Sequence, residues 1–133
     1  MAAPRPTWAG AILALLLSSS PAAAAEVAVL KSSDVAAWRP ALEALRHGLP
    51  GHTVTEYDLR GDRNEAGRVL GALKARPVLL VTFGPFAAEV VRESAPDTFL
   101  VFCMVQDAAK AGLLNSVNAS GVAFSTPIHP VLA

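Results

Sequence analysis

The sequence predicts an α/β domain with a doubly wound, five-stranded parallel sheet. Short runs rich in Val, Leu and Phe alternate with segments of helical periodicity along most of the chain. The segments between the runs are long enough for the crossover connections that parallel strands require. Two of the runs, residues 77–83 and 98–105, are almost continuously apolar. Such runs are typical of strands that are covered on both faces of a sheet.

The first 25 residues have the parts of a cleavable secretory signal peptide. Arg5 supplies a positive charge, residues 8–17 form a short apolar stretch, and Ala23, Ala24 and Ala25 provide small residues before a cleavage point. About ten apolar residues are too few to cross a hydrocarbon core of roughly 30 Å as a helix. We therefore expect cleavage after residue 25 and an exported protein, periplasmic or extracellular. The alternative is an uncleaved amphipathic anchor.

Residues 26–126 carry the predicted domain, and residues 127–133 begin a further element. We expect strands at residues 26–31, 53–59, 77–83, 98–105 and 121–125. We expect helices at residues 36–48, after Asp62 and at residues 86–94, with one or two helical turns at residues 107–114. The apolar residues predicted to face the core from the second and third of these helices are Ala66, Val69, Leu70 and Leu73, and Phe86, Ala87, Val90 and Val91.

Local signals mark where these helices begin. Pro40 fits the first turn of its helix, where a missing N–H is tolerated, and Pro85 fits the first position after a turn at Gly84. Asp62 and Glu65 have the spacing of a capping box. In this motif the Asp62 carboxylate accepts the backbone amide of Glu65, and the Glu65 carboxylate accepts the backbone amide of Asp62.

Composition excludes several classes of function. The chain has 11 basic and 11 acidic residues, without the basic surplus of a nucleic-acid-binding protein. Its single cysteine, Cys103, cannot form an intramolecular disulfide and is expected to be a core thiol, and its three histidines lack the spacing of metal ligands. Nucleotide-binding fingerprints and hydrolase motifs are absent. We therefore expect no metal, no cofactor and no enzymatic activity.

Ligands of doubly wound sheets bind beyond the carboxyl ends of the strands. The polar, glycine or aromatic residues at these ends that we expect to bind a ligand are Ser32, Ser33, Gly84, Pro85, Phe86, Gln106 and Asp107. Each has a structural alternative. Serine and aspartate cap helices, Gly84 suits a tight turn, and Phe86 suits the core. Residues 118–120 match a glycosylation sequon, a pattern that is frequent by chance.

Four segments of the chain resemble the substrate-binding proteins of ABC transporters, in the branch with a type I periplasmic-binding fold that includes aromatic amino-acid binders. These segments are residues 27–34 (VAVLKSSD), 83–87 (FGPFA), 101–107 (VFCMVQD) with 111–113 (AGL) following, and 118–122 (NASGV). The resemblance implies flavodoxin-like strand order, a small solute such as an amino acid held between two lobes, and delivery to a membrane permease. It also implies that the seven residues above line the first lobe's half of the cleft.

The chain departs from this family in two respects. Ala108 stands where the family commonly has proline, and the second lobe is missing, so that residues 127–133 would be the truncated start of a crossover. A half-cleft buries one side of its ligand and should bind it more weakly. Two alternatives are a single-lobe periplasmic sensor or accessory domain that works through protein contacts, and a small exported flavodoxin-like enzyme.

Overall fold

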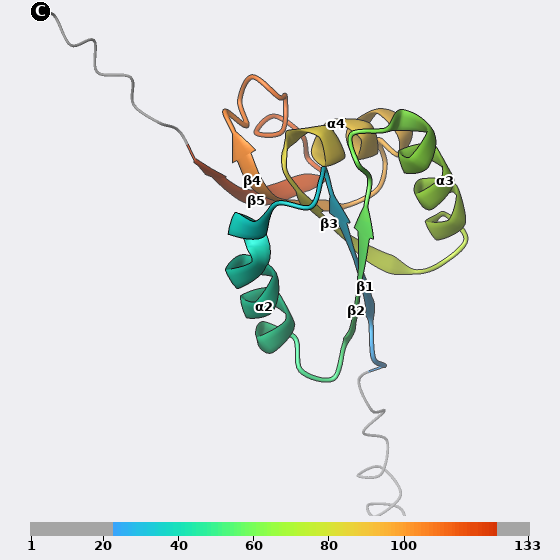
Figure 1. Ribbon diagram of the computed structural model, residues 1–133. Coiled ribbons are helices and arrows are strands. Elements are labelled where there is room, and N and C mark those ends of the chain that lie inside the picture. Colours follow the sequence, from blue (N-terminus) through green and yellow to red (C-terminus); the bar gives the residue numbers. More distant parts are fainter. Residues whose placement is uncertain (1–22, 125–133) are drawn as a thin grey trace, which may run out of the picture.

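The computed structural model describes residues 23–124 and contains one five-stranded sheet whose paired strands are all parallel (Figure 1). The strands are β1 (Glu26–Lys31), β2 (Thr53–Asp58), β3 (Val78–Phe83), β4 (Leu100–Gln106) and β5 (Ala119–Phe124). Their order is β2-β1-β3-β4-β5, which is the expected flavodoxin-like order. The predicted α/β class is therefore confirmed. Most of the predicted leader, and residues 127–133, lie outside the described residues.

Helices lie on both faces of this sheet (Figure 1). A short 3-10 helix, η1 (Ala36–Trp38), leads into α2 (Arg39–Gly48), with Pro40 in the first turn as expected. The other two helices are α3 (Arg63–Leu73) and α4 (Pro85–Ser94). α3 and α4 cover one face together, whereas α2 lies on the opposite face. The two faces are thus unequally covered by the described helices.

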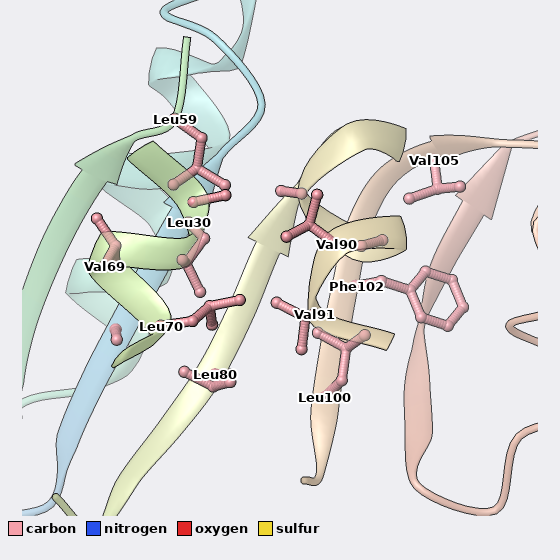
Figure 2. Close-up of a cluster of buried hydrophobic side chains, with 14 of the residues drawn as sticks. Leu30, Leu59, Val69, Leu70, Leu80, Val90, Val91, Leu100, Phe102 and Val105 are labelled. Carbon is pink, nitrogen blue, oxygen red and sulfur yellow. The ribbon is translucent and has the colours of Figure 1, made fainter. Parts of the chain in front are cut away.

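The larger hydrophobic cluster lies between the sheet and the pair α3 and α4 (Figure 2). Leu30 and Leu80 from the sheet meet Leu70 of α3 and Val91 of α4 there. The predicted core faces of both helices are confirmed, except that Phe86 is only half-buried. A smaller cluster, including Val27, Val29, Leu42, Val81 and Phe83, lies between the sheet and α2.

The connection from β4 to β5 differs from the prediction, because residues 107–114 form turns and no helix. Asp107 has a positive φ of 56°, and its carboxylate accepts the amide of Lys110 at 3.1 Å. The Leu113 amide then donates to the carbonyl of Ala108, five residues back, at 2.9 Å. That bond closes a single turn in the manner of a helix end, so the helix does not propagate. Ala108 and Leu113 are buried and anchor the connection.

The predicted capping box at α3 is only half present. The Asp62 carboxylate caps the helix, but it accepts the amide of Asn64 at 2.8 Å and not that of Glu65. Glu65 instead forms a salt bridge with Arg68, 2.5 Å apart, one turn further along. The Glu65 carboxylate, which was expected to accept the Asp62 amide, therefore pairs with a residue further along the helix. The first and last residues of the five strands agree with the predicted bounds to within about two residues, which is the usual uncertainty of element boundaries.

Candidate functional site

The carboxyl ends of the strands meet at one edge of the sheet. Lys31, the last residue of β1, pairs in register with Asp58 of β2 and Phe83 of β3, and Phe83 pairs with Cys103 of β4. The residues predicted to bind a ligand end β4 or lie within three positions after β1, β3 or β4, so all of them lie at this edge. We call it the carboxyl edge. Sequence reasoning placed these residues together correctly, although their individual environments differ.

Ser32 has a structural role at this edge. It is buried, and its amide donates to the carbonyl of Phe83 at 2.9 Å. Its Oγ accepts the amide of Ala87 in the first turn of α4, also at 2.9 Å. Gly84 is the N-cap residue of α4 and has no side chain that could accept an amide of the first turn. The Ser32 hydroxyl supplies this capping hydrogen bond instead. The hydroxyl of Ser32 therefore has one of its two lone pairs occupied by the protein and retains its hydrogen and the other lone pair.

Gly84 is buried between protein side chains. Its φ is +91°, in a region that side chains disfavour. A Cβ at this position would lie 2.6 Å from Oγ of Ser32 and 2.7 Å from the ring of Trp38. Trp38 in turn packs against Phe83, with ring centroids 6.3 Å apart. The absence of a side chain at Gly84 thus lets η1, β1 and α4 meet closely.

The other predicted residues are accessible. Ser33, Pro85, Gln106 and Asp107 are exposed, and Phe86 is half-buried against the larger cluster. One carboxylate oxygen of Asp107 also accepts the Lys110 amide within the turn after β4, although no helix follows for it to cap. These five residues are the ones that a ligand at the carboxyl edge could contact.

An ion-paired hollow of about 310 Å³ lies beside β1, on the side of α2. The Lys31 ammonium lies 3.2 Å from Asp34 Oδ1 and 3.3 Å from Glu56 Oε2, and Arg46 lies 2.7 Å from the other oxygen of Glu56. Burial lowers the pKa of Lys31, but its hydrogen bonds to the two carboxylates outweigh burial and raise that pKa overall. The sequence does not reveal this cluster, because Lys31, Arg46 and Glu56 come from three different elements.

An apolar hollow of about 450 Å³ lies on the α2 face near the ends of β3, β4 and β5. Its lining residues are Ala41, Leu45, Phe83, Cys103, Met104, Val122 and Phe124. Cys103 is therefore half-buried at a surface and is not the core thiol that we expected. Burial raises the pKa of this thiol, which disfavours the reactive thiolate. The sequence could not reveal the hollow, because an apolar strand does not show which face its neighbours leave uncovered.

A bulge distorts β4 next to this hollow. The register between β4 and β5 shifts between Phe102 and Val105, and Met104 has a positive φ of 56°. A β-bulge bends its strand and redirects a side chain. Here the bulge places Met104 beside Cys103 in the lining of the hollow.

Within residues 23–124, no group of three or more His, Cys, Asp or Glu side chains is arranged to hold a metal ion. No helix among the same residues is long and apolar enough to cross a membrane.

The strand order and the interleaved helices define an open, doubly wound α/β domain with flavodoxin-like strand order. A solved structure with this fold is an ABC domain in complex with L-Trp from Streptococcus pneumonia, which superimposes with a TM-score of 0.62 at 17% sequence identity. The match covers 75% of this chain and 38% of that chain, so the present sequence spans well under half of the neighbour's length. At this identity the likeness establishes the fold alone. No protein-family model and no curated protein matches the sequence.

Proposed function

We propose that this chain is the amino-terminal lobe of an extracytoplasmic solute-binding protein of an ABC importer, and that it binds a small polar solute such as an amino acid. The observation that carries the proposal is the carboxyl edge. Exposed Ser33, Gln106 and Asp107 and half-buried Phe86 come from the ends of three strands and gather at this edge of a periplasmic-binding-protein-like sheet. Solutes of open α/β sheets bind at such edges.

The groups at the edge suit a zwitterion with an apolar side chain. The Asp107 carboxylate attracts an ammonium group, and the Ser33 hydroxyl donates to a carboxylate. The amide of Phe86 lies in the first turn of α4, where it has no acceptor within the helix and adds to the positive end of the helix dipole. The half-buried ring of Phe86 offers an apolar surface to the ligand's side chain.

Export and delivery to a permease are part of the same proposal. β1 begins at Glu26, directly after the predicted cleavage point, so cleavage there would leave the whole sheet in the mature protein. Sequencing the amino terminus of the protein recovered from the periplasm or medium tests this step. We expect Glu26 as the first residue, whereas a retained leader on cell-associated protein would contradict export by cleavage.

A thermal-shift screen tests solute binding. We expect at least one L-amino acid, with L-Trp tried first, to raise the melting temperature at millimolar concentration. A ligand at 100 times its Kd stabilises the native state by about 2.7 kcal/mol. The Asp107→Asn variant should lose most of this shift, because asparagine keeps an oxygen for the Lys110 amide but removes the charge.

The control for that variant is Asp97→Asn. Asp97 is also exposed, but it lies between α4 and β4, at the opposite edge of the sheet. Its substitution should leave the ligand-induced shift unchanged. The proposal fails if no amino acid raises the melting temperature, or if both variants respond like the original chain.

The proposal is for binding without catalysis. We expect the purified protein to be colourless, without flavin absorbance and without hydrolase activity.

A second candidate function, a single-lobe accessory domain that works through protein contacts, is favoured by one observation. Val122 and Phe124 expose apolar side chains beside the carboxyl edge, as a docking surface would.

A further inference from the structure

The strand β5 forms one edge of the sheet and presents unpaired backbone groups there. Among residues 23–124 it pairs with β4 alone (Figure 1). The Leu100 amide of β4 donates to the carbonyl of Asn118, directly before β5, at 2.8 Å. Since alternate residues of a strand turn their backbone groups to opposite sides, the even-numbered residues of β5 face β4. The residues whose N–H and C=O groups point away from the sheet are Ala119, Gly121 and Ala123.

This edge lacks the features that usually protect an edge strand. Soluble proteins place charges, prolines or bulges on such strands, or cover them. Residues 119–124 (ASGVAF) include no charged residue and no proline, and the bulge described above lies in β4. Val122 and Phe124 are 71% and 50% exposed. The opposite edge strand, β2, instead carries Glu56 and Asp58. β5 is therefore the edge that can accept a further strand.

We propose that two copies of this chain pair through β5, antiparallel about a two-fold axis at Val122, so that their two sheets become continuous. In this register the outward-pointing groups of Gly121 exchange hydrogen bonds with those of Ala123 in the other copy. The two Val122 side chains face each other, and Phe124 lies opposite Ser120 of the other copy. This inference does not depend on the proposed function.

Charge and symmetry favour a second copy as the occupant. β5 carries no charge and the formal net charge of the whole chain is zero, so two copies do not repel each other. An antiparallel pair of identical strands is isologous, so it occupies both β5 edges and stops at a dimer. Head-to-tail pairing of β5 with β2 would leave free edges, and it would place the apolar strand against the carboxylates of Glu56 and Asp58.

The apolar hollow adds a hydrophobic contribution to the same interface. Val122 and Phe124 both line it on the α2 face of the sheet. Directly opposite residues of paired strands point to the same face. The two-fold axis therefore brings these side chains of both copies together on the α2 face. Their exposed apolar surface gains free energy when it is removed from water.

Analytical ultracentrifugation of the purified protein at micromolar concentrations tests the proposal. We expect a species with twice the mass of one chain. Val122→Lys should raise the dissociation constant of this species at least about tenfold, because it places two like charges against each other at the axis. The matched control is Val117→Lys. Val117 is 93% exposed in the segment between β4 and β5, so the same new charge lies outside the edge and should leave the mass unchanged.

Ala123→Pro tests the backbone contribution separately. The Ala123 N–H points away from β4, so proline removes a donor that the single chain does not use in its ladder. This variant should also weaken the dimer. Cooperative thermal unfolding, followed by circular dichroism, should show that each variant remains folded.

A disulfide across the axis tests the register. Directly opposite residues of a non-hydrogen-bonded antiparallel pair have Cα atoms about 4.5 Å apart, within the disulfide range of about 4.4–6.8 Å. Cys103 is the only cysteine, so Val122→Cys is made together with Cys103→Ser. Oxidised glutathione should then link two copies covalently. Val117→Cys in the same background is the control and should remain unlinked.

Three results overturn the proposal. The first is the mass of one chain at every concentration, which would leave the β5 edge to a strand of another protein or to another part of this chain. The second is a dimer that persists in both Val122→Lys and Ala123→Pro. The third is equal linking of the cysteines at positions 117 and 122, which indicates random collision. No solute is present in these assays, so their result is independent of the amino-acid screen.

Discussion

Ser32 and Gly84 lie where a ligand was expected, but contacts within the protein occupy one lone pair of the Ser32 hydroxyl and the space beside Gly84. The Ser32 hydroxyl caps α4, and Gly84 has the side chains of Ser32 and Trp38 packed against it. The exposed neighbours Ser33 and Asp107 remain available. At the scale of single residues, the carboxyl edge thus consists of a buried junction that sets the geometry and an exposed rim that can contact solute.

Gly84→Ala should destabilise the fold by roughly 2–5 kcal/mol, because the added Cβ combines backbone strain with overlap. The new methyl group would lie 2.6 Å from Oγ of Ser32, at a φ of +91°. Urea denaturation measures the change. Gly71→Ala is the control, since Gly71 lies on α3 with open space around it, and alanine there should stabilise by about 0.5–1 kcal/mol. Equal midpoints for the two variants would refute the close-packing argument.

Ser32→Ala should cost about 1–3 kcal/mol, because it leaves the Ala87 amide without an acceptor in a buried place. Ser33→Ala provides the comparison. Ser33 is exposed, and its substitution should change the free energy of unfolding by no more than about 0.5 kcal/mol. If both serines gave the same loss in chemical denaturation, the cap on α4 would not be a significant source of stability.

At the scale of elements, helix α3 is placed by its amphipathic face and by a side-chain cap. Its four predicted core residues are all buried, and Asp62 accepts the Asn64 amide at its start. Two salt bridges from Arg63, to Glu89 and Glu93 at 2.5 and 2.7 Å, then join α3 to α4. Both carboxylates lie on α4, so the two helices that cover this face are also tied at their exposed sides.

Asp62→Ala should destabilise the protein by about 1 kcal/mol, because the N-cap oxygen at α3 is lost. Asp62→Asn keeps an acceptor oxygen and should retain most of the stability. Thermal unfolding followed by circular dichroism at 222 nm compares the two variants with the original chain. An alanine variant as stable as the asparagine variant would show that the cap contributes nothing measurable.

At the scale of the whole molecule, the partly buried ion pairs of Lys31 with Asp34 and Glu56 couple stability to pH. Burial lowers the pKa of Lys31 in the folded state, but the hydrogen bonds and charges of Asp34 and Glu56 together outweigh burial and raise this pKa overall. Such a group contributes its full stabilisation below the unfolded pKa of about 10.4, and the contribution is lost as pH rises through the folded pKa. The pairs connect β1 to β2 and to the loop after β1, so their loss affects the sheet.

As the pH rises above about 10.4, the unfolded pKa of lysine, we therefore expect the urea midpoint of the original chain to fall more steeply than that of Lys31→Met. Methionine keeps the unbranched, apolar stem but has no proton to lose in this range. Lys110→Met, at an exposed lysine of the turn after β4, serves as the control and should follow the original chain. Parallel curves for the original chain and Lys31→Met would contradict the role assigned to Lys31.

The sequence by itself determined the class of fold, the five strands and the core faces of α3 and α4. These features depend on the spacing of apolar residues along the sequence and on the length of the segments between strands, which must allow the crossovers of a parallel sheet. Both can be read from neighbouring residues in the sequence. The same rule correctly brought Ser33, Gly84 and Asp107 to one edge. Periodicity wrongly suggested a helix after β4, because the turn that ends at Leu113 depends on backbone geometry at Asp107.

Only the tertiary structure decided which side chains at that edge are free and which surface stays uncovered. Ser32 caps a helix that lies 55 positions along the chain, and Glu56 of β2 pairs with Lys31 of β1. Cys103 lines a hollow because no described helix lies over β4 and β5 on the α2 face. Contacts between residues far apart in the sequence have no local signature, since they arise only when the sheet brings separate elements together.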